Sequence, residues 1–271
     1  MDTKKYYLAA GIAAGTLIIC AAAFFFFKPK PPSPVTESAP PRITHPWKKQ
    51  YKGTIAIVID DLGYNSANLN IYAQIRQPLT VSVLPNLQFS AQVSETLHKR
   101  FEVILHLPME PKGTPDIEKN TILAGMPAEE IRAIVNADLD SLKYAKGVSN
   151  HMGSKATEDA ATMDQVCAVL KQRSIYWLDS FVTTKTAGIA SARAAGIHSA
   201  RRDIFLDNRK EGDYIRQQLG KLKAQAAKAG YAVGIGHDRK ITLETLRDEL
   251  PRIAAEGYKF VFVSAVAQKT R

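Results

Sequence analysis

The sequence predicts an α/β fold, a barrel of seven or eight β/α units, over residues 51–271. Short β-rich runs alternate there with longer segments of amphipathic, helical character. The β-rich runs are almost continuously apolar, which is typical of parallel strands covered on both faces. Seven or eight such units in about 220 residues fit a barrel of the TIM type, complete or incomplete, better than an open sheet.

The individual elements follow from this alternation. Strands are expected over residues 54–59, 79–84, 102–105, 147–150, 175–178, 203–206, 232–235 and 258–263. Helices are expected between them, over residues 65–76, 88–100, 128–145, 158–173, 185–195, 209–229 and 240–256. Pro127 directly ahead of Ala128 and Glu129 is typical of a helix start.

The N-terminal segment is expected to lie in a membrane. Residues 6–27 form an uncharged run of 22 residues preceded by Lys4 and Lys5, and a helix of that length spans a bilayer core of about 30 Å. This predicts a signal anchor over residues 1–28. The alternative is a signal peptide cleaved after Ala23, which would leave four phenylalanines at the new N-terminus. Either segment delivers the rest of the chain across the membrane.

A proline-rich linker is expected over residues 29–50, which hold seven of the 14 prolines in the chain. Such a segment behaves as a semi-rigid extended spacer. It would hold the domain of residues 51–271 away from the inner membrane, on the periplasmic side, as part of a single-pass protein. If the signal is cleaved, the domain becomes a free periplasmic or secreted protein.

The charge distribution argues against a nucleic-acid-binding protein, and the positions of the two cysteines exclude a disulfide within the domain. The formal net charge is +10, but residues 1–50 contribute +5, so the other 221 residues are only mildly basic. No basic stripe is interleaved with aromatic residues, so nucleic acid is not an expected partner. Cys20 lies in the apolar run and Cys167 in an expected helix, which excludes a disulfide within the domain.

Polar residues that can bind a metal or move a proton recur where the expected strands end. They are Asp60 and Asp61 after the first strand, His106 after the third, His151 at the fourth, Asp179 after the fifth, Asp207 after the sixth and His237 after the seventh. Catalytic groups of α/β barrels come from the carboxyl ends of the strands. These side chains are therefore expected to converge at one mouth.

Taken singly, most of these residues also have a structural explanation. The stretch from Asp60 to Gly63 is typical of a turn. His106 lies in an apolar stretch, where a core histidine is common, and Asp179 could cap the following segment. Packing does not explain why so many of them fall at one end of the strands.

An aspartate and two histidines form a common ligand set for zinc and similar divalent ions, and they leave positions open for water or substrate. A second carboxylate can act as base on the bound water, whose pKa falls towards about 7 on zinc. A histidine opposite can protonate the leaving group. The sequence contains no His-Glu-x-x-His, Cys-x-x-Cys or Gly-x-Ser-x-Gly motif, which argues against the metal sites and serine hydrolases that carry them.

Five stretches resemble motifs of the divergent polysaccharide deacetylase family and occur in that family's order. They are residues 57–63, 103–111, 147–154, 177–180 and 234–237, and together they extend over nearly all of residues 51–264. The family is related to carbohydrate esterases of the NodB type. The resemblance therefore implies a distorted (β/α) barrel with a metal-dependent site that deacetylates a polysaccharide.

The resemblance to the wider deacetylases also implies roles for residues. Asp60 takes the role of general base and Asp61 that of a metal ligand, and His237 matches the late histidine that acts as acid. We extend the ligand set to His106 and His151 from their positions at strand ends. The bound ion is expected to be divalent, and zinc is expected.

The sequence departs from the wider family in one respect. The family's His-x-x-x-His metal motif is absent, and Glu110 stands where the second histidine after His106 would be. Either Glu110 or His151 must complete the site, and we favour His151 because it ends its own strand. Asp179 is expected to help orient the base.

The leading hypothesis is hydrolysis of an N-acetyl or O-acetyl group on an acetylated envelope polysaccharide, with the metal stabilising the tetrahedral charge. The rival is a non-catalytic glycan-binding or envelope scaffold protein on a degenerate deacetylase barrel, which the missing motif supports. A phosphodiesterase or other metal hydrolase ranks last, because the sequence has neither a phosphate-cradling glycine loop nor a clear two-metal ligand set.

Overall fold

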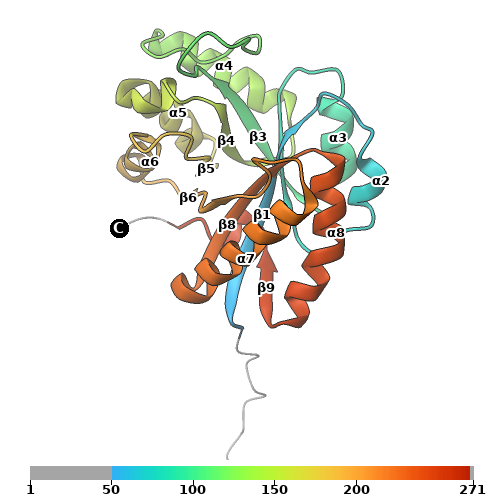
Figure 1. Ribbon diagram of the computed structural model, residues 1–271. Coiled ribbons are helices and arrows are strands. Elements are labelled where there is room, and N and C mark those ends of the chain that lie inside the picture. Colours follow the sequence, from blue (N-terminus) through green and yellow to red (C-terminus); the bar gives the residue numbers. More distant parts are fainter. Residues whose placement is uncertain (1–50, 269–271) are drawn as a thin grey trace, which may run out of the picture. The chain divides into compact units, whose positions relative to one another are not determined.

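The computed structural model describes residues 51–268 of the chain (Figure 1). The predicted anchor, residues 1–28, and the predicted linker, residues 29–50, lie outside these residues. Within residues 51–268, no helix has the length and the apolar character needed to cross a bilayer.

The described residues form one curved sheet with helices packed on its outside. The strands are β1 (Gly53–Leu62), β2 (Thr80–Val83), β3 (Glu102–Met109), β4 (Ala145–Met152), β5 (Tyr176–Asp179), β6 (Ser199–Arg201), β7 (Ile204–Phe205), β8 (Tyr231–His237) and β9 (Tyr258–Val261). The α-helices are α2 (Leu69–Tyr72), α3 (Ser90–Leu97), α4 (Ala128–Ser141), α5 (Ala160–Gln172), α6 (Gly188–Ala195), α7 (Gly212–Ala229) and α8 (Lys240–Ala255). Two short 3₁₀ helices, η1 (Ala156–Glu158) and η2 (Val263–Ala265), complete the set.

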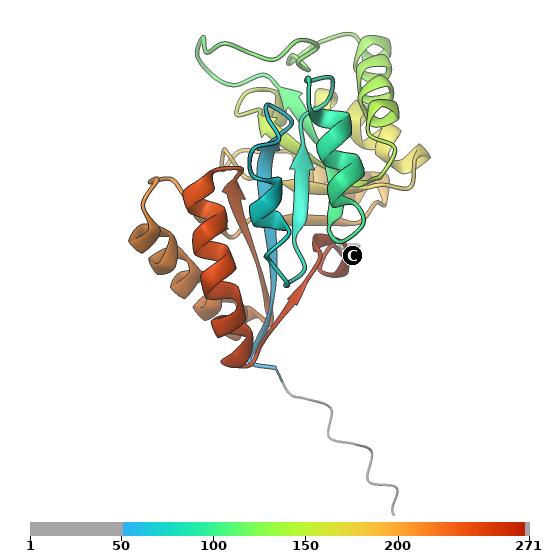
Figure 2. The ribbon, with the colours of Figure 1, turned by 90° about the vertical axis from the view of Figure 1, so that its right-hand side faces the viewer.

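The sheet is a half-barrel that does not close. Its strand order is β6-β5-β4-β3-β2-β1-β8-β7, with β9 beside β1, and every pair of these strands is parallel. Among the described strands no pairing joins β6 to β7. The expected barrel is therefore incomplete, and Figures 1 and 2 show the helices arranged around the outside of the curved sheet.

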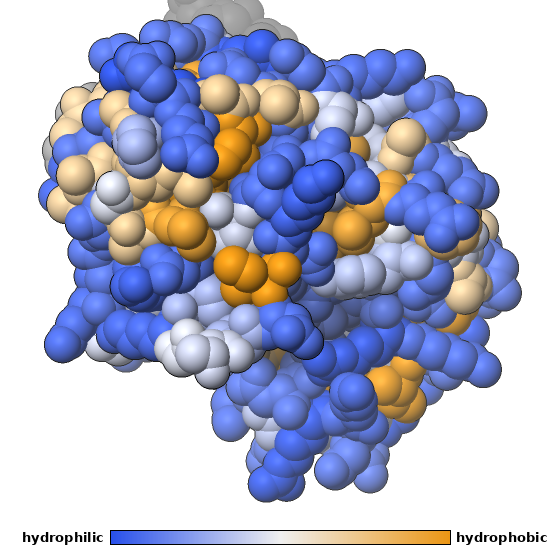
Figure 3. Space-filling model, turned by 90° about the horizontal axis from the view of Figure 1, so that it is seen from above, coloured by the Kyte–Doolittle hydropathy of each residue, from blue (hydrophilic) through white to orange (hydrophobic). Residues whose placement is uncertain are grey.

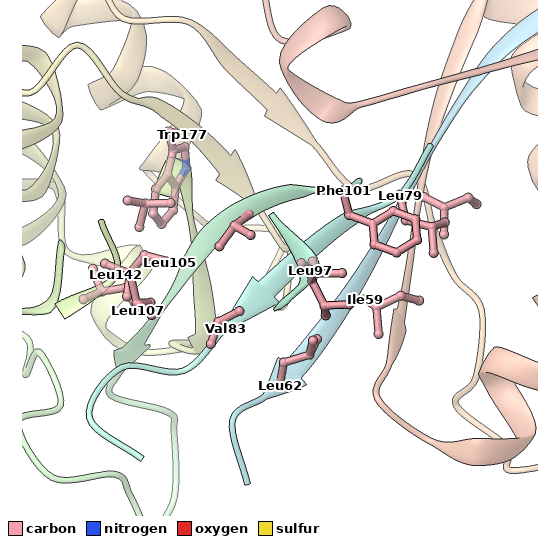
Figure 4. Packing of buried hydrophobic residues seen from close by; sticks show 14 of the residues in the cluster. Ile59, Leu62, Leu79, Val83, Leu97, Phe101, Leu105, Leu107, Leu142 and Trp177 are labelled. Atoms are coloured by element: carbon pink, nitrogen blue, oxygen red, sulfur yellow. The ribbon is translucent and has the colours of Figure 1, made fainter. Parts of the chain in front are cut away.

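Two hydrophobic clusters occupy the two faces of the sheet. The larger one includes side chains of the sheet and of its covering helices (Figure 4), and the smaller one lies on the inner face. On β1 the larger cluster takes Ile55, Ile57 and Ile59, and the smaller takes Ala56 and Val58. Because successive side chains of a strand point to opposite faces, the next inward position on β1 is residue 60.

The predicted elements appear in the predicted order, with differences at their ends. β1, β3 and β4 continue beyond the predicted residues 59, 105 and 150. The predicted helix over residues 65–76 is reduced to α2. At its predicted start the chain turns instead, and Asn65 Oδ1 accepts a hydrogen bond from the backbone N–H of Ala67. The prediction missed β6, a strand of three residues that carries too short a pattern to recognise.

Candidate metal and catalytic site

A β-bulge brings two consecutive carboxylates to the inner face of β1. The register between β1 and β2 shifts between Ile59 and Leu62, and the backbone of Asp61 has φ of 66°. In a regular strand Asp60 and Asp61 would point to opposite faces, and a bulge re-aims one of them. Both carboxylates consequently approach the same imidazole, because Nε2 of His106 lies 3.7 Å from Asp60 Oδ2 and 3.3 Å from Asp61 Oδ1.

Asp61, His106 and His151 form a cluster that can hold a metal ion. Oδ1 of Asp61 lies 3.1 Å from Nδ1 of His151, and the three residues offer ligand atoms within 4.8 Å of one another. The two imidazole rings meet edge to face, with their centroids 5.0 Å apart. Burial opposes ionisation of Asp61, but hydrogen bonds from His106 and His151 outweigh it and hold the pKa of that carboxyl well below its usual range. The carboxyl group of Asp61 is therefore ionised at neutral pH.

A buried serine pair orients His106. The Oγ atom of Ser149 lies 2.8 Å from His106 Nδ1 and 2.7 Å from Ser82 Oγ, and both serines are fully buried. With Nδ1 engaged by Ser149, the other ring nitrogen of His106 is left to face the carboxylates. Support of this kind fixes the tautomer and orientation of a metal-binding histidine. The sequence analysis did not identify these serines.

Asp60 is a buried carboxylate with an unused oxygen. Only 3% of the residue is exposed, and its Oδ1 has no hydrogen-bond partner among residues 51–268. Burial raises the pKa of Asp60, against the opposing influence of His106. A carboxylate whose pKa is raised binds a proton more readily than an exposed one, so Asp60 suits the role of base.

His237 and Asp207 form a hydrogen-bonded pair beside Asp60. The register of β1 and β8 places His237 opposite Asp60. His237 Nδ1 lies 2.8 Å from Asp207 Oδ1, and Asp207 Oδ2 accepts hydrogen bonds from the backbone N–H of His237 and the hydroxyl of Thr242. Burial disfavours the charged imidazole, but the hydrogen bond and charge of Asp207 raise the pKa of His237 above its ordinary value.

The same contacts hold Asp207 as an anion. Burial opposes its ionisation, yet the hydrogen bond from His237 lowers the pKa of Asp207 below its usual range. The sequence placed Asp207 after the sixth predicted strand, as it placed the other candidates, but assigned it no role. Asp207 follows β7, which pairs with β8, the strand that carries His237. The pairing of these two strands, which are distant along the chain, could not be predicted from the sequence.

Asp179 is not part of this cluster. On β5, Leu178 belongs to the inner face, whereas Trp177 lies in the outer cluster, and the same alternation turns Asp179 outward. Its carboxylate accepts hydrogen bonds of 2.8 Å from the backbone N–H of Phe181 and from the hydroxyl of Thr186. Within the described residues no contact joins Asp179 to Asp60, and its observed contacts order the loop between β5 and α6.

The structure also distinguishes between Glu110 and His151, the two residues that could have completed the metal site. Glu110 binds Lys155, with Oε1 2.7 Å from Nζ, and its Oε2 accepts a hydrogen bond from the backbone N–H of Ala124. In the part of the chain that the structure describes, the metal-binding cluster contains His151 and not Glu110.

Comparison with known proteins gives a family. A family model described as divergent polysaccharide deacetylase matches residues 57–267. The uncharacterized protein YibQ of Escherichia coli strain K12 is 33% identical over 196 residues, which are 72% of this chain and 61% of that protein. An uncharacterized protein of Haemophilus influenzae is 32% identical over 195 residues, 71% of this chain and 69% of that protein. The chain thus matches less than two thirds of the length of the Escherichia coli relative.

Solved structures share the fold. An uncharacterized protein of Agrobacterium tumefaciens C58 superimposes with a TM-score of 0.77 at 20% identity, over 82% of this chain and 92% of that chain. A structure described as T48 deacetylase with substrate gives a TM-score of 0.50 at 12% identity, over 80% of this chain and 92% of that one. At these identities the likeness concerns the fold alone.

Proposed function

The chain belongs to the divergent polysaccharide deacetylase family, and on this premise we propose that it is a metal-dependent hydrolase that removes acetyl groups from an envelope polysaccharide. The observation that carries the proposal is the set of contacts that Asp61 makes with His106 and His151. Beside it lie a second buried carboxylate, Asp60, and a histidine with its own carboxylate partner, His237.

The donor atoms of the cluster fit a divalent ion such as zinc. One carboxylate oxygen and two imidazole nitrogens are a ligand set that leaves coordination positions free for water or substrate. Asp61, His106 and His151 would hold the ion. When bound, such an ion polarises an acyl carbonyl and lowers the pKa of water.

The remaining residues supply the proton transfers. Asp60 would accept the proton of the attacking water, since its Oδ1 has no other partner in the described part of the chain. As the bond from the acyl carbon to nitrogen or oxygen breaks, the imidazolium of His237 would donate a proton to the departing amine or alkoxide. Asp207 would hold His237 in place and favour its charged form.

The proposed location follows from the N-terminal sequence. Residues 1–28 would anchor the chain in the inner membrane as a single span, and residues 29–50 would space the domain from it. The site would then meet polysaccharide in the periplasm. A protein with its signal cleaved would act there in free form.

The test of this function is acetate release that depends on added metal. Metal-depleted protein and protein reloaded with zinc, cobalt or nickel would be incubated with N-acetylglucosamine oligomers and with glycan strands of peptidoglycan, and acetate would be measured. We expect release from the reloaded wild type and none from Asp60→Asn. Glycan binding without acetate release under all these conditions would favour the non-catalytic glycan-binding protein instead.

A further prediction concerns the buried serine pair. Ser149→Ala is expected to weaken metal binding about 10- to 100-fold, because it removes the hydrogen bond that orients His106. Competition with a chromophoric chelator would measure the affinity. Ser141→Ala, which removes a hydroxyl bonded to Asp138 on helix α4, is the control and should leave the affinity unchanged. An unchanged affinity in Ser149→Ala would mean that packing alone orients the imidazole.

A further inference from the structure

Exposed apolar side chains surround the mouth of the half-barrel, where the Asp61 cluster lies. Most of the large hydrophobic side chains exposed in residues 51–268 belong to loops or strand ends on this side: Tyr64, Ile117, Leu123, Met152 and Val182. Figure 3, which looks down on this side, shows several separate hydrophobic patches among hydrophilic side chains. Apolar walls around a few polar groups are typical of a ligand-binding site.

Tyr64 stands out because its ring is both exposed and fixed. It follows β1, three positions after Asp61, and is 49% exposed. The preceding Gly63 has φ of 120°, and a Cβ there would lie 2.9 Å from Ser90 Oγ. The backbone N–H of Phe89 also donates to the carbonyl of Gly63. The backbone that carries Tyr64 is therefore packed tightly against the loop that follows β2.

The hydroxyl of Tyr64 joins two loops that are distant in the sequence. It donates a hydrogen bond to Glu118, which belongs to the long connection between β3 and α4. This connection is itself anchored, because Glu110 donates its N–H to the carbonyl of Ile122 at 2.8 Å and Ile122 donates to Pro108 at 2.9 Å. The two loops together form one wall of the mouth.

The wall lies within electrostatic range of the metal-binding cluster. Burial and the hydrogen bond to Glu118 raise the pKa of Tyr64, and the negative charge of Asp61 raises it further. Exposure increases outward along this path, from the buried His106 through the partly exposed Asp61 to Tyr64. The tyrosine ring consequently lies at the rim of the site, beyond the atoms that would bind the reacting group.

We infer that Tyr64, held by Glu118, is the surface on which a pyranose ring next to the reacting sugar stacks, and that the protein thereby selects oligosaccharides over single sugars. The inference rests on the proposed function for the class of ligand. The axial C–H bonds of a pyranose form an apolar face that packs on an aromatic ring by dispersion. The hydrogen bond to Glu118 keeps the ring in one orientation, which lowers the entropy lost on binding.

The test compares oligomers with a monomer in the absence of turnover. Binding of N-acetylglucosamine pentamer, of peptidoglycan glycan strands and of free N-acetylglucosamine to metal-depleted protein would be measured by calorimetry. We expect Tyr64→Ala to weaken oligomer binding about tenfold, and Tyr64→Phe, which keeps the ring but loses Glu118, to weaken it less. Monomer binding should not change. Tyr231→Ala is the matched control, because Tyr231 is an exposed tyrosine at the start of β8, at the other end of that strand from His237.

Each outcome bears on the inference. Equal oligomer affinity in wild type and Tyr64→Ala, an equal loss for monomer and oligomer, or no oligomer binding by folded wild type would overturn it. Oligomer binding that depends on Tyr64, without acetate release after metal is restored, would support it and count against the hydrolase. Acetate release that Tyr64→Ala leaves unchanged, in both rate and KM, would count against the inference alone.

Discussion

Asp61→Ala is expected to abolish metal binding and to lower the proposed deacetylation by roughly three orders of magnitude, because a catalytic metal ion supplies several kcal/mol of transition-state stabilisation. Oδ1 of Asp61 lies 3.3 Å from Nε2 of His106 and 3.1 Å from Nδ1 of His151, so this one carboxylate oxygen approaches both imidazoles. Removing its carboxylate takes away the negative ligand and leaves two imidazoles that no longer share a partner. His151→Ala should have the same effect on the metal.

The measurement is metal content by elemental analysis after dialysis against zinc, together with circular dichroism to establish that the variants fold. His98→Ala is the matched control, since His98 stacks on Tyr144 away from the cluster and its loss should leave the metal in place. Near-stoichiometric metal in the wild type that is lost in Asp61→Ala would support the proposed centre. Wild type that binds no zinc, cobalt or nickel would refute it, and so would full metal content in Asp61→Ala.

The order of the elements could be predicted because it depends on a local signal. Parallel strands that are buried on both faces are continuous apolar runs, and nearly all such runs in this chain became strands. The carboxyl ends of the strands could not be predicted in the same way. The polar His106 in an apolar run had indicated the end of the strand. β3 instead runs through His106 to Met109, because the inner face of the sheet accepts polar side chains close to the mouth.

The differences between the predicted and the observed site concern which face of the sheet a residue occupies. Asp179, like Asp61, lies just beyond the strand predicted for it, but alternation along β5 turns it towards the helices. Ser82 and Ser149 lie on β2 and β4, which are not neighbours in the sheet, and their hydroxyls meet across the inner face. A sequence pattern describes one strand at a time, so it contains neither the bulge that re-aims Asp61 nor this cross-sheet contact.

His237→Gln is expected to lower kcat by about two to four orders of magnitude while metal content stays at the wild-type level, because a general acid contributes that much to a bond cleavage. The change removes the imidazole that is hydrogen-bonded to Asp207 and that would donate the proton. Glutamine keeps a polar side chain of similar length, so the inner face of β8 should still pack. Loss of metal in this variant would show that His237 acts as a ligand instead of as an acid.

Asp207→Asn tests the assignment of His237 as acid through the pH dependence of kcat. His237 must carry its proton to act as acid, so kcat falls as the pH rises through the pKa of His237. Asp207 raises that pKa, and its removal should therefore move the alkaline limb of the kcat profile to lower pH. Asp203→Asn is the matched control, because Asp203 also accepts a backbone N–H of β8 but at Val233, distant from the imidazole. An alkaline limb that stays in place in Asp207→Asn would mean that the ionisation limiting kcat belongs to another group, and the assignment of His237 as acid would fail with it.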